Sequence, residues 1–405
     1  MNKVRSVHYI RGVAALLVML IHWSEVHHGG DYYKHVLRLD FTPQTSATSV
    51  LNELIIHWKV FASNFWLINF NFAALGVLLF FLVSGFVITI SVEGQNVLGF
   101  AIKRFFRLFP VLWFYIAMCI VFQKVLTAIG YPAGTDFTDE QIFSNALLVS
   151  DWMWLPFFDM GFWTLHTEVK FYIVMALFTI MVKQFSWENV FSLALLITII
   201  ALPISFLGTP NDFDVLYNNE SNFGLQTLFY IFTVIGNNAR FLVFMLIGSI
   251  FYLWYTDRIS IGKTFVLIFV MLFLCVLLQT IAPNGLSQGY YIPDYIRAVI
   301  FFFFSIFIEK KCAHRVQVLR CFSKPLSVIG DTSYTMYLFH GLFGMTLISV
   351  VHSYTSNVNF SLLVSFIIVV PIIWFTHRYV ERFSIKLGHK LAELCNNFSV
   401  KVFNT

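Results

Sequence analysis

Residues 66–90 read WLINFNFAALGVLLFFLVSGFVITI, without a single charged side chain. A helix that crosses the hydrocarbon core of a bilayer needs about 20 consecutive, mostly apolar residues. This stretch therefore predicts a membrane-spanning helix. Apolar stretches of similar length recur along the chain at about 8–27, 111–130, 162–182, 188–208, 239–256, 264–282, 295–309, 326–350 and 360–378.

The composition excludes most other classes of protein. The chain has 405 residues, of which 58% are hydrophobic and 12% charged, whereas roughly 25% of residues are charged in soluble proteins. A soluble fold of this size could not bury 48 Phe and 10 Trp side chains. We therefore expect an all-α integral membrane protein of about ten spans. A soluble enzyme, a nucleic-acid-binding protein and a disordered scaffold are excluded.

The sequence predicts one membrane domain over residues 1–380 and a cytoplasmic tail over residues 381–405, because no internal repeat or soluble domain is visible. The stretch 225–236 is apolar but too short to span, so it predicts an interfacial or re-entrant segment. The five cysteines show no CxxC spacing. Neither a disulfide framework nor a metal site is therefore expected.

The distribution of basic residues predicts the orientation in the membrane. If the N-terminus is cytoplasmic, eighteen of the 26 Lys and Arg residues fall in cytoplasmic segments. The outer stretch 131–161 then contains five acidic residues and no basic one. The net charge of +5 thus reflects membrane topology rather than an anionic partner. Both termini are predicted to be cytoplasmic.

Two ionisable residues lie in the first expected span, where they are costly and usually face the protein interior. Arg11 and His22 are eleven residues apart, so they share one helix face and are separated by roughly 16 Å along the axis. This spacing places a cation near the inner surface and an imidazole in the outer half of the membrane. The alternative is that Arg11 reaches lipid headgroups and His22 caps an outer interface.

A polar face opens the fourth expected span, where Thr164, Glu168 and Tyr172 recur every four residues. Glu168 should lie at about the depth of His22. A carboxylate there can orient an imidazole and raise its basicity, as general-base catalysis requires. A structural ion pair between two helices is the alternative.

His340 shares a face of the ninth expected span with Ser333 and Tyr337. It fits a second catalytic group, a substrate-lining residue or a hydrogen bond that packs two helices. Ahead of the third span, Arg104 and Arg107 lie one turn apart. That spacing suits phosphate oxygens, or equally anionic lipid headgroups.

Five segments occur in a recognisable order. They are Arg11-x10-His22, FFLVSGFVIT at 80–89, KRxxRxxP at 103–110, WTLxxExxFY at 163–172 and GDxSYxxYLxH at 330–340. Together they resemble membrane acyltransferase family 3, the bacterial O-acetyltransferases of O-antigens, exopolysaccharides and related glycans. The resemblance extends over about residues 5–380, nearly the whole chain.

The chain departs from the family pattern at a few positions. Two adjacent acids are often found in the fourth-span motif, whereas Val169 and Lys170 follow Glu168 here. His166 replaces a residue that is usually small, and Lys103 replaces an arginine. These changes concern the detail of the substrate rather than the family.

The resemblance implies a multi-pass protein of the bacterial inner membrane. It implies transfer of an acyl group, usually acetyl, from cytoplasmic acyl-coenzyme A to a glycan or an undecaprenyl-linked sugar. The roles it implies are a general base (His22) with catalytic partners Glu168 and Arg11, donor binding by Lys103, Arg104, Arg107 and Ser84, and a substrate lining of Trp163, Tyr337 and His340. No bound cofactor, metal or nucleic acid is implied, and the oligomeric state stays open.

A different class of protein remains as the runner-up. Intramembrane His, Glu and Arg side chains also serve as proton relays and substrate gates. A multi-span glycan flippase or a proton-coupled transporter would therefore fit the same residues. Transporters commonly show internal repeats with paired broken helices, which this sequence lacks.

Overall fold

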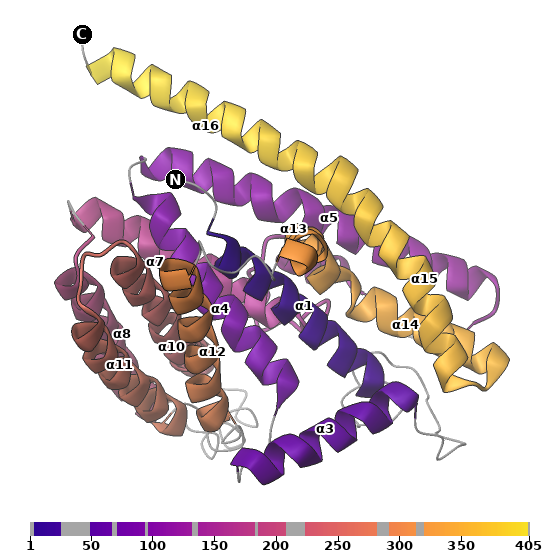
Figure 1. Cartoon of the computed structure of the whole chain (residues 1–405). Helices are drawn as coiled ribbons and strands as arrows, with labels where there is room; N and C mark the ends of the chain where they lie inside the picture. The colour runs from indigo at the N-terminus through magenta and orange to yellow at the C-terminus, as the bar shows by residue number, and fades with distance from the viewer. Residues whose placement is uncertain are drawn as a thin grey trace.

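The computed structural model describes residues 4–25, 49–66, 71–93, 96–131, 137–182, 185–207, 223–281, 291–312 and 320–403. Throughout these residues every regular element is a helix (Figure 1). Eight of the described helices are long and apolar enough to cross a bilayer, or nine if one bent pair counts as a single span. The prediction of an all-helical, multi-pass membrane protein is confirmed.

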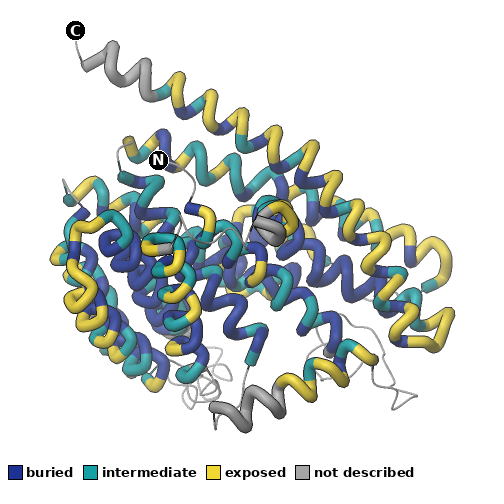
Figure 2. Tube along the Cα trace, viewed as in Figure 1, coloured by how far each residue is buried: buried dark blue, intermediate teal, exposed yellow. Residues whose placement is uncertain are grey.

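The centre of the bundle is α4 (Phe72–Val92), which packs against α1 (Arg5–Glu25), α10 (Phe223–Tyr255) and α12 (Tyr291–Cys312). α1 also packs along α13 (Arg320–Phe339). Most of α4 is buried (Figure 2). A helix that is apolar all round is stable only when it is surrounded on every side, and this explains the central position of α4.

The remaining spans surround this centre. α7 (Phe162–Met181) contacts α4 and α5 (Val97–Ala128), while α8 (Trp187–Leu207) and α11 (Ile261–Ile281) pack on α10. The outward faces of α8 and α11 expose large apolar side chains such as Ile199 and Phe269 (Figure 2). Such faces are expected of helices in contact with lipid, because lipid tails are as apolar as the side chains.

The C-terminal part of the described chain forms one long rod. α15 (Val358–Thr376) continues through a π-helical turn at His377–Glu381 (η3) into α16 (Arg382–Phe403). α16 lies along α5 (Figure 1), where Gly388 allows Phe106 to approach closely. The segment that we predicted as a tail is therefore helical as far as Phe403 and packed on the membrane domain.

Several predicted boundaries differ in the structure. The span predicted over 66–90 is α4, which begins at Phe72, and the span predicted from residue 111 is part of α5, which begins at Val97 and contains Arg104 and Arg107. The stretch 225–236 is not a separate short segment but the first part of α10, because the helix continues unbroken to Tyr255. The ninth predicted span is two helices, α13 and α14 (Leu342–Thr355), which meet at an angle of 68°. Two shorter helices, α3 (Val50–Trp66) and α6 (Asp139–Ala146), connect the spans, and α3 lies at the end of the bundle opposite α16 (Figure 1).

Glycines set the spacing of the central helices. A Cβ atom added to Gly85 of α4 would overlap the main-chain carbonyl of Met245 in α10, and one added to Gly248 would lie 2.8 Å from the nitrogen of Phe86. Likewise, a Cβ on Gly12 of α1 would lie 2.7 Å from the main-chain nitrogen of Gly330 in α13. Small residues let membrane helices approach to backbone contact. These two crossings therefore fix the distances between the helices that carry the candidate site.

Replacing Gly85 by Ala should disrupt the crossing of α4 and α10, because the new methyl group has no space. Overpacking of this kind lowers the free energy of unfolding by about 1–3 kcal/mol or more. Thermal unfolding of detergent-purified protein, followed by fluorescence, measures the change. Gly262→Ala is the matched control, since no atom lies within 4 Å of its added Cβ. Equal melting temperatures for both variants would contradict the packing argument.

Candidate active site

A cavity lies inside the bundle where α1, α4, α5, α7 and α13 meet. About 760 Å³ between its lining residues is free of protein atoms, and this volume includes space that is open to solvent. The polar part of its lining consists of Arg11, Ser84, Arg104, Arg107, Thr164, Glu168, Tyr172, Tyr334 and Tyr337. Segments far apart in the sequence thus contribute to one site, and most of the residues singled out from the sequence line it.

Glu168 is the carboxylate of the cavity. Its Oε1 accepts hydrogen bonds from the Ser84 hydroxyl at 3.0 Å and from the Tyr172 hydroxyl at 2.6 Å. The four-residue spacing along α7 places Tyr172 one turn below Glu168, as the sequence predicted. The sequence predicted that Glu168 orients His22. In the structure, the Oε1 atom of Glu168 instead accepts hydrogen bonds from hydroxyls of α4 and α7. Ser84 therefore lies directly beside Glu168.

Arg104 is one of the three arginines that line the cavity with Glu168. Its guanidinium lies over the rings of Phe100 and Tyr172, at 5.5 and 5.6 Å, and it donates a hydrogen bond to Ser91. Its Nε atom is buried and has no hydrogen-bond partner among the described residues. A buried donor without a partner is uncommon in native proteins. Arg104 thus has a donor atom that no described residue satisfies.

Arg107 and Arg11 complete the charged lining. Arg107 lies 4.0 Å from the carboxylate of Glu381, which also accepts hydrogen bonds from Thr335 and His377. Arg11 interacts electrostatically with the same carboxylate and with Glu168. Nothing in the sequence motifs pointed to Glu381. An acidic residue just after the last apolar stretch was the available signal.

Four of the ten predicted site residues lie outside the cavity lining, namely Lys103, Trp163, His22 and His340. The positive charge of Lys103 is close enough to act electrostatically on His389 of α16. Trp163 packs against Phe81 and Phe241, with ring centroids 6.0 and 5.3 Å away. Donor binding by Lys103 and substrate lining by Trp163 stay predictions.

His22 and His340 form a pair beside the cavity. The Nδ1 atom of His22 lies 3.0 Å from the Nε2 atom of His340, and the planes of the two rings are nearly parallel, with an angle of 10° between them. His340 is fully buried and its Nδ1 atom contacts the main-chain oxygen of Tyr337 at 2.5 Å. The Tyr337 side chain lines the cavity and contacts the Thr164 hydroxyl at 2.8 Å. Tyr337 therefore links the cavity to the histidine pair.

The bend between α13 and α14 occurs directly after His340. The indole nitrogen of Trp23 donates to the main-chain oxygen of His340 at 2.9 Å, and the carboxylate of Asp159 accepts from the nitrogen of Leu342 at 2.6 Å. Asp159 also accepts hydrogen bonds from Tyr115 and from the nitrogen of Gly161. Burial raises the pKa of Asp159 above its usual value, although these bonds oppose the effect. Backbone groups that the bend leaves without helical partners thus form hydrogen bonds with side chains of other elements.

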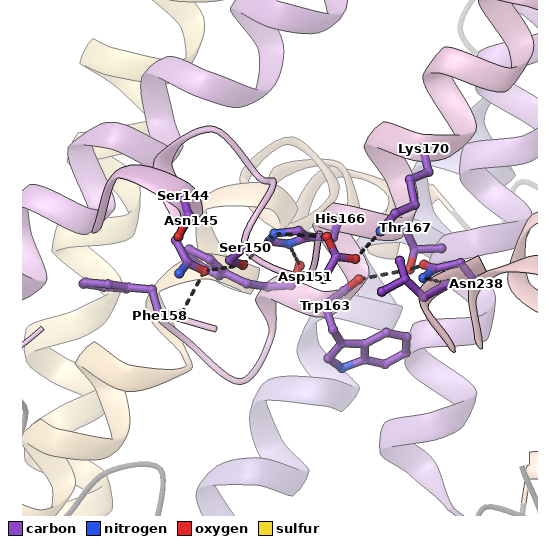
Figure 3. Close-up of polar contacts among 12 residues, drawn as sticks. Ser144, Asn145, Ser150, Asp151, Phe158, Trp163, His166, Thr167, Lys170 and Asn238 are labelled. Carbon is purple, nitrogen blue, oxygen red and sulfur yellow. Dashed lines mark hydrogen bonds and ion pairs between the residues drawn. The ribbon is translucent and has the colours of Figure 1, made fainter. Parts of the chain in front are cut away.

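A second polar cluster holds the loop before α7 in place (Figure 3). Ser150 contacts Nε2 of His166 at 2.9 Å, and Asp151 forms an ion pair with Lys170. The other ring nitrogen of His166 contacts the main-chain oxygen of Phe162 at 2.8 Å. His166 and Lys170 are two of the departures from the family pattern. In this chain they bind the preceding loop and do not belong to the cavity lining.

This geometry defines a class of protein. A multi-pass membrane bundle encloses a cavity lined by three arginines and a carboxylate, with a histidine pair beside it. A family model described as an acyltransferase domain matches residues 4–378. The chain belongs to this family, acyltransferase family 3, and is a membrane acyltransferase. No curated protein and no solved structure matches the chain.

Replacing Asp159 by Ala should destabilise the bend after His340. The nitrogen atoms of Gly161 and Leu342 would lose their buried acceptor, which costs about 1–3 kcal/mol for each donor left without a partner. Thermal unfolding and limited proteolysis of the purified protein measure the loss. Glu140→Ala serves as the control, because Glu140 is an exposed acid in the same inter-span region. A stability equal to that of the control would show that the bend does not depend on Asp159.

Proposed function

We propose that this acyltransferase moves an acetyl group from cytoplasmic acetyl-coenzyme A to a hydroxyl of a cell-surface glycan or its undecaprenyl-linked precursor. The observation that carries the proposal is the continuity of the site. Arginines line one part of the cavity, and Tyr337 connects it to His340 and His22. A donor held by its phosphates and an acceptor near an imidazole would need such an arrangement. The proposal places the protein in a bacterial inner membrane.

The donor end is supported by the chemistry of arginine. Guanidinium groups bind phosphate oxygens through charge-assisted hydrogen bonds in a fixed geometry. Arg104 and Arg107 both reach the cavity from the first part of α5, and the Nε atom of Arg104 retains a donor. Coenzyme A carries several phosphate groups and a long pantetheine arm. That arm would extend along the cavity between Ser84 and Tyr337, with the thioester at its end.

The reaction at the histidine pair would be a direct transfer. The oxygen of the acceptor hydroxyl forms a bond to the thioester carbonyl carbon while its proton passes to His22. The carbon–sulfur bond then breaks, and the coenzyme A thiolate takes up the proton that the imidazole carried. Glu168 and Arg11 would act on the donor part of the cavity, where the hydroxyls of Ser84 and Tyr172 hold the carboxylate.

Purified protein in liposomes tests the function directly. Acetyl-coenzyme A with a labelled acetyl group is supplied with an extracted glycan or polyprenyl-linked sugar, and mass spectrometry follows the label. Transfer of the label with release of free thiol supports the proposal. Movement of sugar across the bilayer without cleavage of the thioester would support the transporter instead.

Changing Arg104 to Ala should raise KM for acetyl-coenzyme A and leave the amount of inserted protein nearly unchanged. Each lost charge-assisted hydrogen bond is worth about 1.5–3 kcal/mol, or about ten- to a hundredfold in donor affinity. Initial rates at varied donor concentration give the result. Lys386→Ala is the control, because Lys386 is an exposed cation on α16. An unchanged KM together with a loss of inserted protein in Arg104→Ala would indicate that Arg104 binds lipid headgroups and not the donor.

Changing His22 to Ala should abolish most of the acetyl transfer while the protein still inserts. Proton transfer by a positioned side chain typically contributes about 10²–10⁴-fold to the rate. The rate of free thiol release in the presence of acceptor measures the effect. His57→Ala, which changes an exposed histidine of α3, should retain full activity. If His22→Ala inserts normally and keeps more than about a tenth of the rate, His22 is not the base.

A further inference from the structure

His340 lies at the break between α13 and α14, where the structure leaves its ring little freedom. The ring has no exposed surface, and its centroid lies 5.2 Å from that of His22. Its main-chain oxygen accepts from Trp23 at 2.9 Å, and its main-chain nitrogen donates to Met336 at 3.1 Å. The backbone on both sides of the imidazole is therefore held by hydrogen bonds.

The contacts of the ring determine which nitrogen carries the proton. Nδ1 lies 2.5 Å from the main-chain oxygen of Tyr337, and a carbonyl oxygen can only accept. Nδ1 of His340 must therefore be the donor in this contact. Burial without exposed surface favours the neutral imidazole, because the charged form loses its hydration. In a neutral ring with hydrogen on Nδ1, the other nitrogen, Nε2, carries a lone pair.

The tautomer of His340 also determines the tautomer of His22, because the two rings are in contact. The Nε2 atom of His340 lies 3.0 Å from the Nδ1 atom of His22. Since Nε2 of His340 is an acceptor, Nδ1 of His22 must carry a hydrogen and donate it. The neutral His22 ring then carries its lone pair on Nε2, and this is the nitrogen that can take up a proton.

We infer that His340 is a positioning residue that fixes the tautomer of His22, so that Nε2 of His22 is the atom that removes the acceptor proton. The inference rests on the proposed function of His22 as the base. It also assigns His340 a different role from a second base, because both of its ring nitrogens have partners in the pair. The order of hydrogen bonds runs from the Tyr337 carbonyl through His340 to His22.

The same series of hydrogen bonds connects the tautomer of His22 to the cavity. The Tyr337 carbonyl that holds His340 belongs to the residue whose hydroxyl contacts Thr164 at 2.8 Å and the oxygen of Gly161 at 3.2 Å. The same residue lines the cavity. An acyl donor in the cavity would therefore contact the side chain of Tyr337. The main-chain oxygen of the same residue holds His340, which in turn fixes the tautomer of His22. Partners that set the tautomer of a working histidine in this way act through orientation rather than through contact with the substrate.

Two substitutions of similar size separate this role from simple packing. The side-chain oxygen of Gln reaches about as far as Nε2 of histidine, so His340→Gln can still accept from His22. The shorter Asn side chain reaches only the position of Nδ1, so His340→Asn loses that acceptor. We expect His340→Asn to lower kcat by about ten- to a hundredfold, the cost typical of removing a partner that orients a histidine. His340→Gln should recover most of the loss, and KM for acetyl-coenzyme A should stay within about twofold in both variants. Equal kcat values for the Gln and Asn variants would overturn the inference.

Nitrogen NMR of protein labelled at histidine supplies a readout that does not depend on activity. The signal of His22 is identified by its loss in His22→Ala, and its two nitrogen shifts report which atom carries the hydrogen. We expect hydrogen on Nδ1 in the unmodified protein. Hydrogen on Nε2 would overturn the inference even if both His340 variants fail to fold.

The outcomes distinguish this inference from the proposed function. If His22→Ala keeps its activity, the general base is wrong, whichever tautomer the spectrum shows. If His22→Ala is inactive but the His22 ring of the unmodified protein carries hydrogen on Nε2, the base remains and the role assigned to His340 is wrong. Activity lost in His22→Ala, hydrogen on Nδ1 and recovery by His340→Gln together support both.

Discussion

The structure depends on the pairing of polar groups inside an apolar bundle. Lipid offers no hydrogen bonds, so a charge or a freed backbone group within the spans needs a partner from the protein. Glu168 meets this requirement through Ser84 and Tyr172, and the buried Glu381 meets it through Thr335 and His377. One partner of each acid, Ser84 of α4 or Thr335 of α13, comes from another helix, whereas Tyr172 and His377 lie one turn away from the acid on its own helix. The contacts of Ser84 and Thr335 therefore tie helices together as well as stabilising a charge.

The break between α13 and α14 shows the same requirement in the backbone. A bend of 68° frees main-chain groups that a straight helix would bond internally. Trp23 and Asp159 bind those groups from α1 and from the loop before α7. As a result, the ring of His340 is held at a fixed place beside His22. An irregular backbone inside the bundle is tolerated here because it is buried in protein and its polar groups are hydrogen-bonded.

Much of the fold and part of the site could be predicted from the sequence. Long uncharged stretches predict spans, since a single segment satisfies its own backbone groups in lipid only as a helix. The four-residue spacing of Glu168 and Tyr172 predicted their shared face, and the structure shows their hydrogen bond. The boundaries were less certain. Residues 225–236 continue into α10, because a helix extends as far as its neighbours support it rather than as far as hydropathy indicates.

The sequence by itself determined the membrane class, the helical periodicity and the polar faces, because each of these depends on residues close together in the chain. It also contains the motifs by which the chain belongs to acyltransferase family 3. Only the tertiary structure decided which polar faces meet. Glu168 turned out to bind Ser84, and His22 to pair with His340, although 318 residues separate the two histidines. Such pairings follow from helix crossings like that of Gly85 with Gly248, and periodicity within one helix carries no information about its neighbour.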